Sequence, residues 1–376
     1  MRNLSKYIST AWIVFALFHS IAGNATVSDP VAAGNAALKK SLSLKPNGTA
    51  IIAALAKSNF SYMEKLLKDS EDAYASDPLF ESPLEKNYSA FRHLHEDFLS
   101  LLNKWIVERP GYQSYLARGI YFSGKAWSAR GGEFIQNTPK KNIEEMERFL
   151  GLAKKDLVEA LHRNANLMPA YIRLISAARA LGEQTEARSW LEAAIRNDPR
   201  TYYVRFHYLV NLTPRWGGSY EEMDRVAREA IAYNHLNNRL WSLQGERFAD
   251  EADMAYSKCD HLKAISLYSK ALAFGDRTMW FRFRANSYSD VGNYELALQD
   301  VRSFLSYSPN DKDRLRFEKQ LEDAVARPSG TDYIPKIRTT CLGGPHTGDD
   351  EAAIRRRTGI KQAEFVGETC GVPGCA

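Results

Sequence analysis

Residues 119–126, GIYFSGKA, have the glycine spacing of a phosphate-binding loop. Such a loop surrounds phosphate oxygens with backbone amides, and a Ser or Thr hydroxyl at its end holds magnesium. Ala126 occupies that last position, and the apolar pattern of a helix continues through the stretch. Because amides inside a helix are already bonded, we expect no nucleotide binding here. Gly119 and Gly124 are instead expected to permit close helix packing.

Residues suited to metal binding or acid–base catalysis are scattered. His93 and His95 are two positions apart, so on a helix they would point to different faces. The stretch around Ser219, GGSYE, lacks the final glycine of a nucleophile elbow. Carboxylate pairs at 144–145 and 221–222 coincide with expected helix starts, where the helix dipole favours them. The sequence therefore predicts no catalytic residue, no cofactor, no metal and no enzymatic activity.

The first residues have the order of a secretory signal peptide. Arg2 and Lys6 precede an apolar run at 11–18, and small residues follow it. The run is shorter than the roughly 18 to 20 residues that a spanning helix needs, so a cleaved signal is favoured over an anchor. We expect cleavage after Ala22 or Ala25, and a periplasmic or secreted protein without stable membrane insertion.

The chain has four cysteines: Cys259, Cys341, Cys370 and Cys375. An even number in an exported protein suggests disulfides, and the segment from Cys370 to Cys375 is short and turn-rich enough to close on itself. His346 and the last three cysteines could instead bind zinc. Both short gaps hold four residues and one pairs Cys with His, a spacing that favours disulfides over a zinc site.

Composition is that of an ordinary globular protein, with 44% hydrophobic and 25% charged residues among 376. The net charge of +5 arises from 50 basic and 45 acidic residues spread along the chain. Because the basic residues form no stripe, nucleic-acid binding is not expected.

Residues 168–199 and 278–309 share one pattern. Each has an aromatic near its start, a glycine at a turn (Gly182 and Gly292), an alanine five positions later and a closing proline. Glycine permits a tight turn, alanine lets two helices approach, and proline ends the second helix. The pattern resembles the tetratricopeptide repeat, a helix–turn–helix unit of about 34 residues. A degenerate copy precedes the second segment, with Cys259 at the turn position.

Apolar residues recur at helical spacing through much of the remaining chain, and no alternating strand pattern competes. The expected helical segments are 50–76, 88–107, 112–130, 143–164, 201–212, 219–233, 236–257 and 311–326. We therefore predict an all-α, tetratricopeptide-like α-solenoid of helix hairpins from about residue 45 to 326, whose last helix caps the array. A loop-rich tail follows.

Arg282 and Asn286 are four positions apart in the last full repeat, and so lie side by side on its first helix. First helices line the concave face of such arrays. The pair resembles part of the carboxylate clamp with which some tetratricopeptide domains hold peptide C-termini. Ala249 and Asp253 at the matching positions of the preceding repeat do not extend it, so a polar groove is expected rather than a full clamp.

Three stretches resemble a bacterial family of uncharacterised function with tetratricopeptide-like helices. They are AWSARGGEF at 126–134, AYIRLISAARALGEQTEA at 170–187 and LTPRWGGSYEEM at 212–223. The family has A-W-x-x-R-G followed later by P-[RK]-W-G-G-S, and the resemblance covers roughly residues 45–240. It implies a helical fold but no activity. The motif positions in this chain are Trp127, Arg130, Gly131, Arg215, Trp216, Gly217 and Gly218.

Most residues of the stretch at 212–223 are expected to end one helix and begin the next. Thr213 and Pro214 should end one helix, Gly217 and Gly218 should supply unusual backbone angles, and Ser219 with Glu222 should form a capping box for the next helix. Arg215 and Trp216 are left unexplained by this role. We expect the tryptophan to pack on neighbouring helices, and the arginine to reach a carboxylate or stack on a ring.

The expected organisation is a signal peptide at 1–25, a helical-hairpin domain at 26–240, tetratricopeptide repeats with a capping helix at 241–326 and a Cys-containing tail at 327–376. The favoured function is non-enzymatic binding of a peptide or protein partner in the concave groove. The candidate binding residues are Trp127, Arg130, Arg215, Trp216, Arg282 and Asn286.

One alternative is a hydrolase-like enzyme with a pocket near Arg130 and Arg215, which would need a carboxylate or histidine beside them. Others are a periplasmic, toxin-neutralising immunity-type protein and a structural envelope component.

Overall fold

The computed structural model describes residues 29–132 and 137–326, and these residues form an all-α array without a strand. Its first half contains α2 (Pro30–Ser43), α3 (Gly48–Ala56), α4 (Phe60–Ser76), α5 (Glu81–Ser89), α6 (Phe98–Glu108), α7 (Tyr112–Arg130), α8 (Lys140–Arg163), α9 (Met168–Leu181) and α10 (Gln184–Asn197). Its second half contains α11 (Tyr203–Asn211), α12 (Tyr220–Ile231), α13 (Glu246–Ser257), α14 (His261–Leu272), α15 (Thr278–Asp290), α16 (Tyr294–Tyr307) and α17 (Lys312–Val325). Short 3₁₀ turns lie at η1 (Pro78–Phe80), η3 (Pro214–Trp216) and η4 (Asn238–Gly245).

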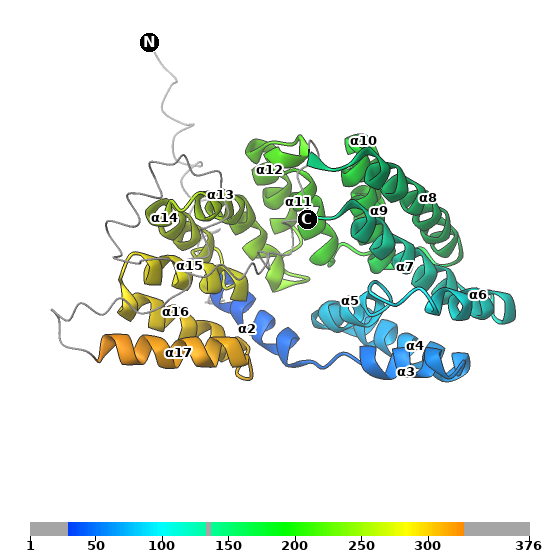
Figure 1. Cartoon of the computed structure of the whole chain (residues 1–376), viewed down its shortest axis with the longest axis horizontal. Coiled ribbons are helices and arrows are strands. Elements are labelled where there is room, and N and C mark those ends of the chain that lie inside the picture. Colours follow the sequence, from blue (N-terminus) through cyan, green and yellow to red (C-terminus); the bar gives the residue numbers. More distant parts are fainter. Residues whose placement is uncertain (1–28, 133–136, 327–376) are drawn as a thin grey trace, which may run out of the picture.

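Consecutive helices pack in pairs, most extensively α7 with α8, α13 with α14 and α15 with α16. The pairs follow one another in a curved succession, as Figure 1 shows. This packing is that of an α-solenoid, as predicted. No helix among the residues described is long and apolar enough to cross a bilayer.

The turns between paired helices show why glycine recurs in the sequence. Gly182 and Gly292 have φ angles of 73° and 81°, in the left-handed region that glycine adopts without steric cost. Cys259 occupies the equivalent turn of the α13–α14 pair with a φ of 60°. The turn between α13 and α14 thus has a left-handed residue as the other two turns do, although that residue is not glycine.

Several expected helix boundaries are wrong. The α-helix expected over 236–257 begins only at Glu246, after η4, and the segment expected over 50–76 is two helices, α3 and α4. The helix expected over 88–107 begins only at Phe98, because α5 ends at Ser89 and residues 90–97 form turns. Phe91 and Leu94 are buried within those turns, so their spacing matched a helix although the backbone there is not helical. The array also begins earlier than residue 45, with α2. The Asp29 side chain caps that helix by accepting a hydrogen bond from the Val31 amide at 2.9 Å.

Helix α2 packs against η4, two hundred residues later in the chain, and lies in the middle of the array in Figure 1. A Cβ added at Gly34 would be only 3.0 Å from the Asn238 carbonyl oxygen, so the contact needs a glycine. The Asn35 side chain accepts a hydrogen bond from the Asp276 amide at 2.6 Å. These contacts join the first described helix to the second half of the array.

The apolar core is divided along the array. The largest cluster of buried residues runs from Ile51 to Leu243, and two smaller clusters follow at 249–283 and 281–321. The division into domains near residue 240 stays a prediction. The expected signal peptide and Cys-containing tail lie outside the described residues.

Candidate functional site

Two of the motif tryptophans meet in space. Trp127 lies near the end of α7 and Trp216 ends η3, and their ring centroids are 6.2 Å apart at an interplanar angle of 88°. An edge-to-face contact of this kind is favourable for two aromatic rings. Both rings are partly exposed. The fold therefore brings the A-W-x-x-R-G and P-R-W-G-G-S segments together.

Two guanidinium groups lie over these rings. The Arg130 guanidinium carbon is 5.8 Å from the centroids of both Trp127 and Trp216. The guanidinium of Arg179, from α9, is 5.5 Å from the Trp127 centroid and 5.1 Å from that of Trp216. These distances are within the range of cation–π attraction. We call these four residues the Trp–Arg cluster.

Arg130 and Arg179 have few polar partners in the described part of the chain. Arg130 is only 7% exposed, and its Nη1 donates to the Gly131 carbonyl at 3.2 Å. The Arg179 Nη2 donates to the Ser176 hydroxyl at 3.4 Å, while its Nε is buried without a partner. Burial lowers the pKa of Arg130, and burial together with Arg215, Arg92 and Arg130 lowers the pKa of Arg179 to about 10.

Arg215 points to a different partner from Arg130. Its Nη2 is 2.6 Å from Oδ1 of Asp250 on α13, and the Tyr220 hydroxyl donates to the other carboxylate oxygen at 3.0 Å. Asp250 is 7% exposed, and its pKa is raised by burial although Arg215 acts to lower it. The carboxylate that the enzyme alternative requires near Arg215 is thus present, but both its oxygens hold structural partners. The ion pair joins η3 to α13.

The corner that carries Trp216 is held at several points. Gly217 has a φ of 85°, as expected for a turn glycine. Gly218 does not have an unusual φ, contrary to prediction; it is required because an added Cβ would lie 2.2 Å from the Leu212 carbonyl oxygen. The Ser219 hydroxyl accepts a hydrogen bond from the Glu222 amide at 3.2 Å and so caps α12, as expected. The side-chain amide of Gln184 donates a hydrogen bond to the Trp216 carbonyl oxygen at 2.8 Å.

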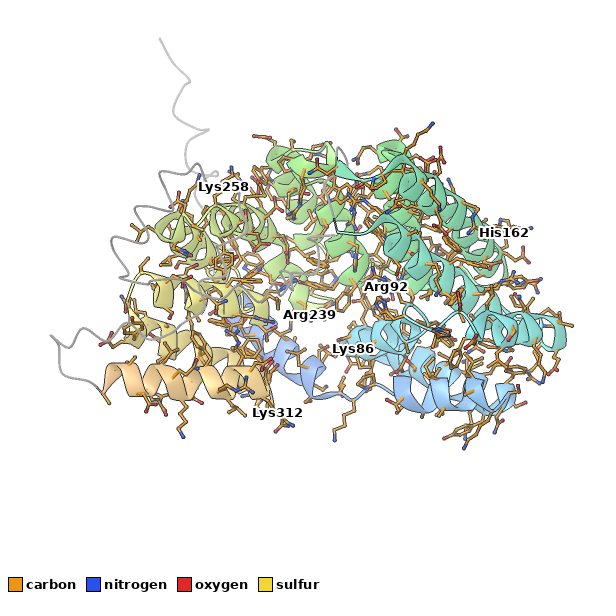
Figure 2. The ribbon with its side chains drawn as sticks, viewed as in Figure 1. Lys86, Arg92, His162, Arg239, Lys258 and Lys312 are labelled. Atoms are coloured by element: carbon orange, nitrogen blue, oxygen red, sulfur yellow. The ribbon has the colours of Figure 1, made fainter. Side chains whose placement is uncertain are left out.

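A second group of cations lies around His207 on α11. Burial sets the pKa of His207 well below its usual value, and the charges of four arginines lower it further: Arg173, Arg179, Arg92 and Arg277. Burial, with Arg173, also lowers the pKa of Arg92. Arg92 is labelled near the middle of the array in Figure 2. Arg173 and Arg277 are paired with Glu85 and Glu246, whereas Arg92 and Arg179 have no carboxylate in direct contact among the described residues. The sequence did not reveal that these arginines lie near His207.

Arg282 and Asn286 belong to a separate group on α15. Nη1 of Arg314, from α17, donates to the Asn286 side-chain oxygen at 3.0 Å, and Asn286 donates to the Tyr256 hydroxyl at 3.3 Å. The Arg282 Nε is buried without a partner. Burial lowers the pKa of Arg314, and Arg282 lowers it further. Arg314 was not predicted, because it lies on a helix that reads as a solvated cap.

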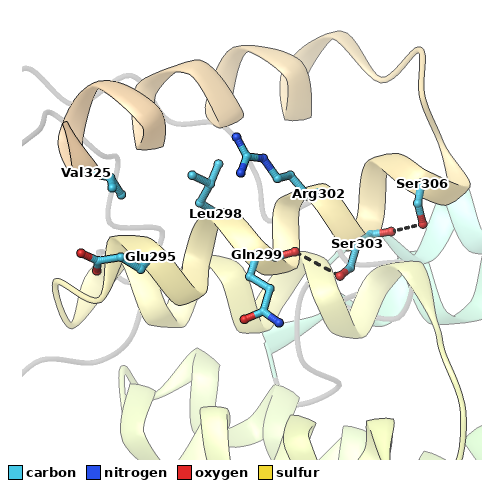
Figure 3. Close-up of a pocket in the computed structure, with 7 residues that line it drawn as sticks. All are labelled: Glu295, Leu298, Gln299, Arg302, Ser303, Ser306 and Val325. Carbon is cyan, nitrogen blue, oxygen red and sulfur yellow. Dashed lines mark hydrogen bonds between the residues drawn. The ribbon is translucent and has the colours of Figure 1, made fainter.

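Two surface hollows lie elsewhere. The larger, about 600 Å³ in volume, lies between α16 and α17 (Figure 3) and includes Arg302. Arg302 is already paired, at 3.1 Å with Glu318 and at 2.6 Å with Glu322. The smaller hollow lies at the start of α10, over residues 182–189. Neither contains a predicted binding residue.

The cysteine predictions can be located only in part. Cys341, Cys370, Cys375 and His346 lie outside the described residues, so both the disulfide and the zinc interpretations stay predictions. Within 29–132 and 137–326, no group of three His, Cys, Asp or Glu side chains is placed to hold a metal ion.

Comparison with known families identifies one segment. Residues 183–241 match a family model described as a domain of unknown function (DUF4034). The match covers α10 to η3 and α12, and therefore Arg215 and Trp216 but not Trp127 or Arg130. No curated protein matches the chain. The described residues are thus an all-α array of paired helices, one segment of which is similar to a domain of unknown function.

Proposed function

We propose that this protein is an exported, tetratricopeptide-like binding protein that captures a peptide or protein partner without catalysing a reaction. The observation that carries the proposal is the group formed by Arg282, Asn286 and Arg314. Two guanidinium groups and an amide from α15 and α17 are adjacent there, and no carboxylate of the described residues is paired with either arginine. Such donors are suited to a carboxylate of a peptide.

The charges at this group favour a ligand over a purely structural role. Burial is the largest cause of the lowered pKa of Arg314, the charge of Arg282 lowers that pKa further, and Asp311 and Asp313 act in the opposite direction. Elsewhere in the same repeats, the fold neutralises a half-buried arginine: Arg284 pairs with Asp300 through two contacts of 2.7 Å. A bound carboxylate would relieve the repulsion at Arg282 and Arg314 in the same way. Neutralisation of a periplasmic toxin would be one case of such capture.

The test uses the chain from residue 26 onward and a pool of random heptapeptides, either with a free C-terminal carboxylate or amidated. We expect selection of free-carboxylate peptides, and at least tenfold weaker binding in the double variant Arg282→Glu, Arg314→Glu. Arg228→Glu is the control, because Arg228 is an exposed arginine of α12, outside this group. No selection, or equal binding by the double variant and the control, would refute the proposal. Circular dichroism checks that both variants are folded.

A further inference from the structure

The Trp–Arg cluster differs from the arginines of this fold that are neutralised by a carboxylate. Several half-buried or buried arginines have a carboxylate in direct contact. Such pairs are Arg118–Asp156, Arg173–Glu85, Arg215–Asp250, Arg277–Glu246 and Arg284–Asp300. Arg205 and Arg239 lack a direct pair but lie in the field of Glu81, which favours their charged forms. Among the described residues, no carboxylate acts on Arg130 or Arg179 in this way.

The two arginines nevertheless occupy the same place. Each guanidinium lies within 6 Å of the same two indole rings, which hold the flat groups by cation–π attraction. Aromatic faces attract a cation but do not cancel its charge, so two guanidinium groups remain beside each other. The additional charges of Arg92 and Arg215 act on Arg179 as well. Arg215 is itself paired with Asp250, so the excess of positive charge comes chiefly from Arg130 and Arg179.

Solvent can reach this excess of charge. Trp127, Trp216 and Arg179 are each partly exposed, and Arg130 is 7% exposed. The Arg179 Nε and part of the Arg130 guanidinium have no acceptor within the described residues. Guanidinium donors held in fixed orientation suit the oxygens of carboxylates and phosphates.

We propose that the Trp–Arg cluster is a binding site for a multivalent oxyanion, with Arg130 and Arg179 as its donors. The site is distinct from the Arg282 group and does not depend on the function proposed for that group. The tryptophans position the guanidinium groups, and the ligand supplies the negative charge that the described part of the chain lacks there. Polycarboxylates and condensed phosphates share this chemistry.

The first experiment titrates the chain from residue 26 onward with citrate, pyrophosphate or chloride at constant ionic strength, and follows thermal unfolding and tryptophan fluorescence. We expect a saturable rise in the unfolding temperature with citrate, pyrophosphate or both, and no rise with chloride. The fluorescence change should be reduced in Trp216→Phe. Comparison of citrate with pyrophosphate distinguishes the two sources of oxyanion. An equal response to all three salts would overturn the proposal.

The second experiment separates binding from stability. Arg179→Met retains a long side chain over the rings but removes the charge. We expect it to weaken oxyanion binding at least tenfold while the unliganded variant unfolds at the same or a higher temperature, since a repulsion has been removed. Arg148→Met is the matched control: its guanidinium carbon is 4.1 Å from the Phe149 centroid, but its side chain is 59% exposed. The control should bind as the parent does.

A purely structural role gives the opposite result. If Arg179→Met lowers the unfolding temperature and leaves oxyanion binding unchanged, Arg179 is a packing residue and the proposal is wrong. Should Arg179→Met fail to fold, Arg130→Lys keeps a charge at the second donor but removes its fork geometry, and weaker binding is again expected. The double variant with Arg282→Glu and Arg314→Glu should still show the rise in unfolding temperature with citrate or pyrophosphate. Failure at one site therefore does not imply failure at the other.

Discussion

Two helix glycines, Gly124 in α7 and Gly151 in α8, should respond in opposite ways to the same substitution. Replacing glycine by alanine inside a helix ordinarily raises stability by roughly 0.5–1 kcal/mol, because alanine loses less backbone freedom on folding. Gly151 is exposed, and an added Cβ would meet nothing within 4 Å. Gly151→Ala should therefore raise the free energy of unfolding by about that amount.

Gly124 faces the turn that follows α5. A Cβ added there would be 1.8 Å from the Arg92 carbonyl oxygen and 2.8 Å from its carbonyl carbon. Backbone atoms cannot rotate aside as a side chain can, so α7 or the turn must shift by an ångström or more. Overpacking of this kind typically costs about 1–3 kcal/mol and sometimes more. After the helix-propensity gain is subtracted, Gly124→Ala should lower the free energy of unfolding by about 2 kcal/mol.

Urea unfolding followed by far-ultraviolet circular dichroism measures both variants against the parent chain. The expected difference between them is about 3 kcal/mol, with opposite signs relative to the parent. Equal stabilisation by the two alanines would show that α7 and the turn are not in close contact, and the reasoning from the Gly124 geometry would be refuted. Destabilisation by both would show instead that α8 is not an ordinary exposed helix at Gly151.

Two further predictions concern buried carboxyl groups. Glu81, which is 1% exposed, accepts hydrogen bonds from the Thr201 hydroxyl at 2.6 Å and from the Tyr202 and Tyr203 amides at 2.8 and 3.0 Å. Glu81→Gln replaces one of the two acceptor oxygens with an NH₂ group, so at least one of these buried donors loses its acceptor, and the change should cost about 2–3 kcal/mol in urea unfolding; an unchanged midpoint would contradict it. Burial raises the pKa of Asp290 from 3.8 to about 7. Between about pH 4 and 7, the Asp290 carboxyl therefore keeps its proton in the folded state and loses it in the unfolded state, so the free energy of unfolding falls as the pH rises. Asp290→Asn should therefore stabilise the protein at pH 8, by at most about 4 kcal/mol, but not at pH 4; an equal shift at both pH values would refute this assignment.

The helix pairs could be predicted because their signals are local. The turn glycines, the closely packing alanines and the closing prolines act within one repeat, and α9–α10 and α15–α16 follow from them. The turns at 90–97 could not be predicted in the same way. Phe91 and Leu94 are buried there by neighbouring helices, and burial gives turn residues the same apolar spacing as helix residues.

The candidate sites depend on contacts between distant segments. Arg179 lies inside a repeat-like helix and reads as an ordinary polar residue; only packing of α9 beside the corner after α11 places it over Trp127 and Trp216. Arg314 likewise becomes a partner of Asn286 only when α17 packs beside the last repeat. Single-sequence spacing carries no information about either contact. It did identify Trp127, Arg130 and Trp216, because their motif positions are not explained by helix formation.

The corner at 212–223 shows that a structural role and a binding role do not exclude each other. Its glycines permit a turn so tight that a Cβ added at Gly218 would overlap the Leu212 carbonyl. Its arginine, Arg215, is paired with Asp250. Each of these features fixes the backbone on one side of Trp216. Because the backbone around Trp216 is fixed, its indole ring is held in contact with Trp127. The two rings together then determine where the guanidinium groups of Arg130 and Arg179 can lie. Gly218→Ala, which forces the corner to shift without changing the charge near Arg179, should therefore weaken citrate or pyrophosphate binding in the same titration, and unchanged binding would contradict this role of the corner.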